Sequence, residues 1–167
     1  MFMEKCLKFK YIEKNLLKLL SLILDSQPIL KYIFYLNNDP QSQPNVTENL
    51  LETGHIILTP FNSTILSEQK VCMFINPYSG NLEKQPLSNL VYLIDIVIPS
   101  SKWLLSGLGE IRAFRISDEI SKLIDKQRVM GITETEITQF KIYKVGDSYS
   151  GLSLWIRVNS STMKGLR

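Results

Sequence analysis

Residues 115–126 read Arg-Ile-Ser-Asp-Glu-Ile-Ser-Lys-Leu-Ile-Asp-Lys, and two segments of alternating polarity follow them, Thr138–Val145 and Leu152–Asn159. The apolar residues of the first stretch recur every three or four positions, which predicts one buried face of a helix. We expect Ser117 to be its N-cap. The polar stretch Gly146–Gly151 lies between the two segments and predicts a turn. The pattern therefore predicts a helix followed by a β-hairpin, and it contains no reactive group.

The second strand of this hairpin has two different faces. One face carries Leu152, Leu154, Ile156 and Val158, and the other carries Ser153, Trp155, Arg157 and Asn159. Because successive side chains of a strand point to opposite faces, one face can pack against a core while the other is offered to a partner.

Two helices are predicted before this region. Apolar residues recur at helical spacing over Lys8–Asp25, and their stripe is wide enough for more than one surface to cover it. Pro28 suits the first turn of a second, shorter helix. That helix should stop in residues 37–40, because the residue before Pro40 avoids the helical conformation.

Three strands are expected between the helical regions, at His55–Leu58, Val71–Ile75 and Leu90–Ile98. The stretch Asn76–Asn81 is rich in turn formers and predicts a turn. The longest strand is apolar on both faces, which predicts a central position in the sheet. Asp95 is the exception within it, and we expect its carboxylate to pair with a cation or to lie at an edge or a subunit contact.

These elements predict an α+β fold, with an antiparallel or mixed sheet of four to five strands, helices packed on one face and an N-terminal helical arm. We expect the arm to cover residues 1–27, the core domain residues 28–159 and a C-terminal tail residues 160–167. The helix before the hairpin could also form a parallel crossover, so the strand order stays open.

The bulk composition is that of an ordinary folded domain. Of the 167 residues, 44% are hydrophobic and 21% are charged, which argues against disorder throughout. The formal net charge of +3 is too weak to indicate nucleic-acid binding. The apolar run Leu16–Leu24 is about half of the roughly 20 residues that span a bilayer, so no membrane partner is expected. Cys6 and Cys72 lie far apart, and reduced thiols are the simplest interpretation.

Catalytic chemistry has little support in the sequence. His55 is the only histidine, so neither a His-rich metal site nor a catalytic triad has the residues it needs. The Gly107-Leu108-Gly109 turn lacks the third glycine of a dinucleotide-binding loop. We therefore expect no enzyme, no catalytic residue, no metal, no cofactor and no small-molecule substrate.

One alternative comes from the carboxylates. Asp95, followed by Glu110-Ile111-Arg112, faintly resembles the acid and acid-x-lysine arrangement that holds Mg²⁺ in nucleases. Arg112 is a poor replacement for that lysine, because a guanidinium is not a compact point charge. A small metal-dependent nuclease, or a nucleic-acid-binding accessory protein, is the alternative hypothesis.

The aromatic and basic residues favour a protein interface over base stacking, because Trp, Tyr and Arg are enriched where proteins meet. The candidate interface residues are Trp103, Trp155, Arg157, Tyr78, Leu16 and Leu20.

The order of features resembles the neck proteins of tailed bacteriophages, the group of head–tail connector, tail-completion and tail-terminator proteins. The resemblance lies in the helical stretch Leu30–Pro40, the strand Leu90–Ile98, Trp103 in its loop, the segment Ile111–Ile120 with Gly131-Ile132 after it, and the hairpin closing on Tyr149–Leu154. It covers most of residues 28–159.

The resemblance implies a structural virion protein at the portal vertex, assembled in the cytoplasm of a host bacterium. Its copies would form a cyclic ring that bridges portal and tail, with portal, neck and tail proteins as neighbours. DNA would pass through the ring only as cargo. The polar loops at residues 60–69 and 76–89 and the terminal extensions could then lie on adjoining subunits, and the N-terminal arm on an adjoining ring or the portal.

Overall fold

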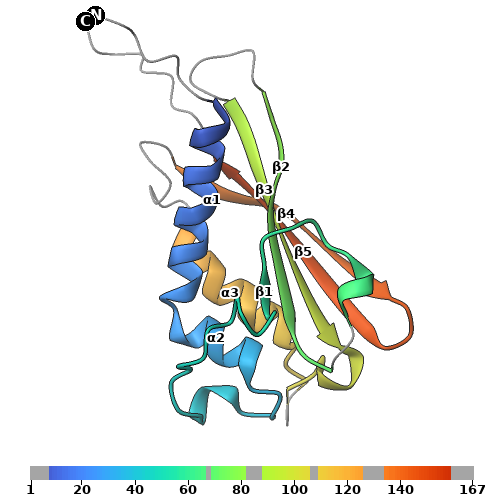
Figure 1. The fold of residues 1–167 in the computed structure, drawn as a ribbon. Helices are drawn as coiled ribbons and strands as arrows, with labels where there is room; N and C mark the ends of the chain where they lie inside the picture. The colour runs from blue at the N-terminus through green and yellow to red at the C-terminus, as the bar shows by residue number, and fades with distance from the viewer. Residues whose placement is uncertain (1–7, 67–68, 82–87, 106–108, 126–133, 159–167) are drawn as a thin grey trace, which may run out of the picture.

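The computed structural model describes residues 8–66, 69–81, 88–105, 109–125 and 134–158 (Figure 1). The helices are α1 (Lys8–Leu24), α2 (Gln27–Phe34) and α3 (Arg112–Ile124), and the strands are β1 (Ile56–Ile57), β2 (Cys72–Asn81), β3 (Ser88–Pro99), β4 (Thr135–Val145) and β5 (Tyr149–Val158). The three helices lie on one side of a single mixed sheet (Figure 1). The predicted α+β class is confirmed.

The sheet has the strand order β1-β2-β3-β5-β4. β1 pairs with β2 in parallel, and every other neighbouring pair is antiparallel. β3 is the central strand, as its two apolar faces predict. β5 lies between β3 and β4, so these two strands run in the same direction and α3 connects them as a split β-α-β unit. The predicted hairpin is confirmed, and the parallel crossover that the sequence left open also exists.

The main core lies between the sheet and the helices, on what we call the helix face. β3 contributes Tyr92, Ile94 and Ile96, and β5 contributes Leu152, Leu154 and Ile156. The opposite side of the sheet, which we call the second face, carries a smaller cluster of Cys72, Phe74, Val97 and Tyr149. Phe61 and Leu66, which lie between β1 and β2 in the sequence, pack against this cluster. The alternation predicted for β5 is confirmed, since its apolar residues face the helices.

Helix α1 packs on the same core as the rest of the chain. Leu19 and Ile23 have no exposed surface, and Tyr92 Oη on β3 donates a hydrogen bond to the Ile12 carbonyl at 2.8 Å. Burial raises the pKa of the Tyr92 phenol. Part of the segment that we expected to be an arm is therefore joined to the sheet layer.

Four local predictions are wrong. The turn predicted over Gly146–Gly151 is shorter, because Tyr149–Gly151 already pair with β4 as part of β5. Residues 76–81 continue β2, because they pair with β3 through two register shifts around Ser79. Helix α3 begins at Arg112 with Ile111 as its N-cap, and Ser117 lies inside the helix, where its Oγ donates to the Ala113 carbonyl at 2.8 Å. The second helix ends at Phe34, before the predicted stop. Gly131 lies outside the described residues.

Candidate interaction surface

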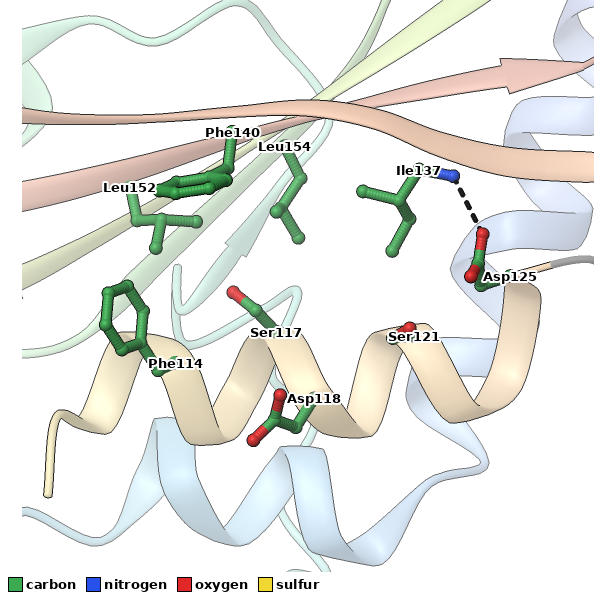
Figure 2. A pocket seen from close by; sticks show the side chains of 9 residues that line it. All are labelled: Phe114, Ser117, Asp118, Ser121, Asp125, Ile137, Phe140, Leu152 and Leu154. Atoms are coloured by element: carbon green, nitrogen blue, oxygen red, sulfur yellow. Dashed lines mark hydrogen bonds between the residues drawn. The ribbon is translucent and has the colours of Figure 1, made fainter.

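An open groove of about 530 Å³ runs between α3 and the last two strands, on the helix face (Figure 2). We call it the α3–β4 groove. Its lining residues are Phe114, Ser117, Asp118, Ser121 and Asp125 on the helix side and Ile137, Phe140, Leu152 and Leu154 on the strand side. The helix-side positions are spaced i, i+3, i+4, i+7 and i+11, so they form one stripe along α3. The groove exists because this stripe has serines at its centre, whereas the neighbouring isoleucine stripe fills the core.

Aromatic side chains meet at one end of this groove. The rings of Phe114 and Phe140 are 6.4 Å apart between centroids and nearly perpendicular, at 84°. Phe140 is nevertheless 61% exposed, and its neighbour on the same face of β4, Ile142, is 47% exposed. Apolar side chains gathered on a surface in this way mark places where proteins associate.

Among the described strands, β4 beside the groove is an edge strand. β4 spans eleven residues and, within the described ranges, pairs only with β5. A long edge strand presents unpaired backbone donors and acceptors and is a template for association with another chain. The groove and the edge together make this side of the molecule suited to binding a partner.

The groove has an acidic rim. Asp125 Oδ1 accepts a hydrogen bond from the Ile137 amide at 3.1 Å, which ties the end of α3 to β4 (Figure 2). The Asp118 side chain is 62% exposed, and its contact with Arg115 is 4.0 Å long. Arg115 and Lys122 instead hold Glu110 and Glu119 in close ion pairs. Both cations have a closer carboxylate partner, so Asp118 is held by the longer contact with Arg115 alone, and its exposed carboxylate can accept a further cation.

Asp95 lies on the second face, in the centre of the sheet. It is only 4% exposed, and its Oδ1 accepts hydrogen bonds from Ser153 Oγ and, at 3.3 Å, from Tyr143 Oη. Burial raises the pKa of the Asp95 carboxyl, and the two hydroxyl donors partly offset that rise. Tyr143 reaches Asp95 by lying over Gly151, where a Cβ would clash with its ring. The expectation of a cation partner or an edge position for Asp95 is wrong, because hydroxyls satisfy its carboxylate in mid-sheet.

Arg112 is a buried structural residue. Its side chain has no exposed surface, and its guanidinium donates hydrogen bonds to the carbonyls of Lys102 (3.1 Å), Tyr32 (2.9 Å), Tyr35 (2.8 Å) and Asn37 (2.6 Å). Three of these carbonyls lie at or after the C-terminal end of α2, where helices leave acceptors without partners. Burial lowers the pKa of Arg112, but an arginine stays protonated in proteins. Arg112 therefore joins α2, α3 and the loop before α3.

The three residues of the nuclease hypothesis are not brought together. Asp95 faces away from the helices, Arg112 is enclosed by the end of α2, and Glu110 pairs with Arg115. Within the described ranges, no group of three His, Cys, Asp or Glu side chains could hold a metal ion. The arrangement does not support the nuclease hypothesis.

The remaining chemically notable residues are buried. His55 Nδ1 donates to the Val71 carbonyl at 2.8 Å, which ties the start of β1 to the start of β2. Cys72 is buried in the smaller cluster of the second face. Across the part of the chain that the structure describes, no helix is both long and apolar enough to cross a membrane.

The six predicted interface residues occupy several surfaces, and their roles at an interface stay predictions. Trp155 and Arg157 lie half-buried on the second face, with Trp155 opposite Leu93 of β3. Tyr78 is 60% exposed on β2, whereas Trp103 and Leu16 pack against the main core and Leu20 belongs to it.

Sequence reasoning missed the α3–β4 groove. The shared face of Phe140 and Ile142 was visible in the strand pattern, but the helix stripe of Phe114, Ser117 and Ser121 was not recognised as a surface. The available signal was Ser117 and Ser121, which follow Phe114 at helical spacing and leave one side of an amphipathic helix without large side chains at its centre.

A comparison with protein families identifies the family of this chain. No curated protein sequence matches the chain. The profile of the YomW family matches residues 26–158, which include α2, α3 and the whole sheet. The chain belongs to the YomW family, whose name suggests a phage-associated protein.

Proposed function

We propose that this YomW-family chain is a non-enzymatic structural protein of the virion, whose copies form a cyclic ring in the neck of a tailed phage. The ring would bridge the portal and the tail around the DNA channel. The family match supports the phage association, and the order of sequence features supports the neck position.

One observation carries the proposal of self-association. The edge of β4 that no other described strand pairs with lies beside the α3–β4 groove, and Phe140 and Ile142 are exposed on this side of the molecule. Burying apolar surface stabilises an interface by about 25 cal/mol for each Å². An exposed apolar surface beside an edge strand is stabilised when another protein covers it. Association therefore explains this surface better than chemistry on a small molecule does.

The protein would then act through the shape of its ring and through binding between subunits. Identical subunits that join head to tail through unlike surfaces form a ring when the rotation between them closes. Portal, neck and tail proteins would cover the two rims of the ring, and DNA would pass through it as cargo. A net charge of +3 is compatible with this passage, because a strongly basic lumen would hold the phosphate backbone.

The proposal is tested on phage particles that carry an epitope-tagged copy of the chain. Purified particles should contain the chain in a fixed small number of copies, and gold-labelled antibody should mark the head–tail junction. Absence of the chain from purified particles, or label spread over the capsid or along the tail, would contradict the neck assignment.

A further inference from the structure

The two sides of the helix layer carry different exposed surfaces. α1 packs over β2, towards one edge of the sheet, whereas α3 packs over β3, β5 and β4 (Figure 1). The outer side of α1 and the α3–β4 groove are therefore at opposite ends of one layer. A single copy can offer both surfaces at the same time.

The outer side of α1 is both apolar and basic. Phe9 is 72% exposed and Leu17 is 50% exposed, two turns apart on the helix. Lys10, Lys14 and Lys18 are also exposed and follow one another at i, i+4 and i+8, next to Leu17. Glu13 is exposed as well and lies one turn from both Phe9 and Leu17. This ridge therefore carries three lysines, one carboxylate and two large apolar side chains that the described residues leave uncovered.

The α3–β4 groove has the complementary character. Its strand side is apolar, with Phe140, Leu152 and Leu154, and its helix side carries the carboxylates of Asp118, which points away from the strands, and Asp125 (Figure 2). An amphipathic helix that lays its apolar side into such a groove is a common mode of recognition. Opposite charges around the groove would orient the helix and steer its approach.

We propose that α1 of one copy binds in the α3–β4 groove of the next copy, with Leu17 against Phe114 and Phe140 and with Lys14 and Lys18 beside Asp118. This inference rests on the proposed ring and names its contact. Because the two surfaces differ and lie at opposite ends of the helix layer, the contact is heterologous, and each copy uses one surface for each neighbour.

Two single variants test the contact from its two sides. Leu17→Asp places a charge on the α1 ridge, and Phe140→Asp places one at the groove. Both positions are exposed, so each variant should keep the wild-type circular dichroism spectrum and melting temperature. Each should weaken self-association by about 30-fold or more, as expected for a central interface residue. Leu51→Asp, at an exposed position outside both surfaces, is the matched control and should assemble as the wild type does.

Mixing the two variants gives the decisive readout in light scattering. Leu17→Asp keeps an intact groove and Phe140→Asp keeps an intact α1, so the mixture should form a one-to-one dimer and nothing larger. A charge swap adds a second readout, because Asp118→Lys should restore assembly to a Lys14→Glu/Lys18→Glu variant.

The outcomes separate this contact from the ring itself. If the wild type assembles and either single variant assembles equally well, the contact is overturned while the ring stands. If both variants are monomeric and their mixture stays monomeric, the two surfaces do not bind each other and the contact is also overturned. A wild type that is monomeric at every concentration overturns both the ring and the contact.

Discussion

Replacing Arg112 with methionine tests whether one buried guanidinium joins the helices to each other. The substitution keeps a long unbranched side chain but removes all four hydrogen bonds to the carbonyls of Lys102, Tyr32, Tyr35 and Asn37. A buried acceptor left without a partner costs about 1–3 kcal/mol. The variant no longer buries a charge, and water can enter the site to bond the carbonyls. Both effects offset part of that cost.

We expect a net loss of about 3–5 kcal/mol in the free energy of unfolding, a large share of the roughly 5–15 kcal/mol typical of a whole domain. For a chain of this size, such a loss lowers the melting temperature by about 10 °C. Arg112→Lys should have a free energy of unfolding between those of the wild type and Arg112→Met, because an ammonium keeps the charge but cannot donate to all four carbonyls.

Urea unfolding followed by circular dichroism gives the free energies directly. Arg115→Met is the matched control, because it removes an arginine of the same helix whose ion pair with Glu110 is at the surface. It should cost much less than Arg112→Met. The reasoning is refuted if Arg112→Met unfolds within about 1 kcal/mol of the wild type, the scale of an ordinary surface change.

Three further substitutions have definite expected results. Asp95→Asn should flatten the pH dependence of the free energy of unfolding. Because the folded pKa of Asp95 is raised, wild-type stability should fall as the pH rises from the unfolded pKa to the folded pKa. If urea titrations gave both proteins the same change of stability with pH, this prediction would be contradicted. Gly151→Ala should cost about 1–3 kcal/mol, because the new methyl group displaces the Tyr143 ring, and unchanged tyrosine fluorescence together with unchanged stability would contradict that packing. Leu19→Ala should cost about 2–5 kcal/mol if α1 is part of the core, whereas a detached arm would give almost no change in the thermal melt.

Much of the fold follows from periodicity alone. The alternation in residues 152–159 correctly predicts which side chains of β5 face the helices, and the apolar run of β3 correctly predicts its central place. The 3.6-residue period locates the three α-helices of the described residues. These patterns are reliable because burial against a layer selects one face of every element.

The errors arise where tertiary contacts override local preference. Residues 76–81 have the composition of a turn, yet their pairing with β3 keeps them extended. Ser117 is a good N-cap residue, but the helix begins earlier, because Ile111 bridges to Leu104 and the Arg112 amide bonds to the Trp103 carbonyl. Local propensity indicates the conformation that a segment prefers, and tertiary contacts determine which conformation it adopts.

The candidate interaction surface was harder to predict for the same reason. Phe114 and Phe140 are far apart in the sequence, and only the placement of α3 against β4 brings their rings together. The partners of Arg112 on α2 and beyond it lie 75 to 80 residues earlier, and they are backbone carbonyls. No pattern of side chains in the sequence marks an acceptor of that kind.

Sedimentation velocity of the purified wild-type chain over a wide concentration range tests the central claim most directly. The account predicts one closed species containing several copies, whose size does not grow with concentration and which forms rings in negative-stain images. A monomer at every concentration would contradict it.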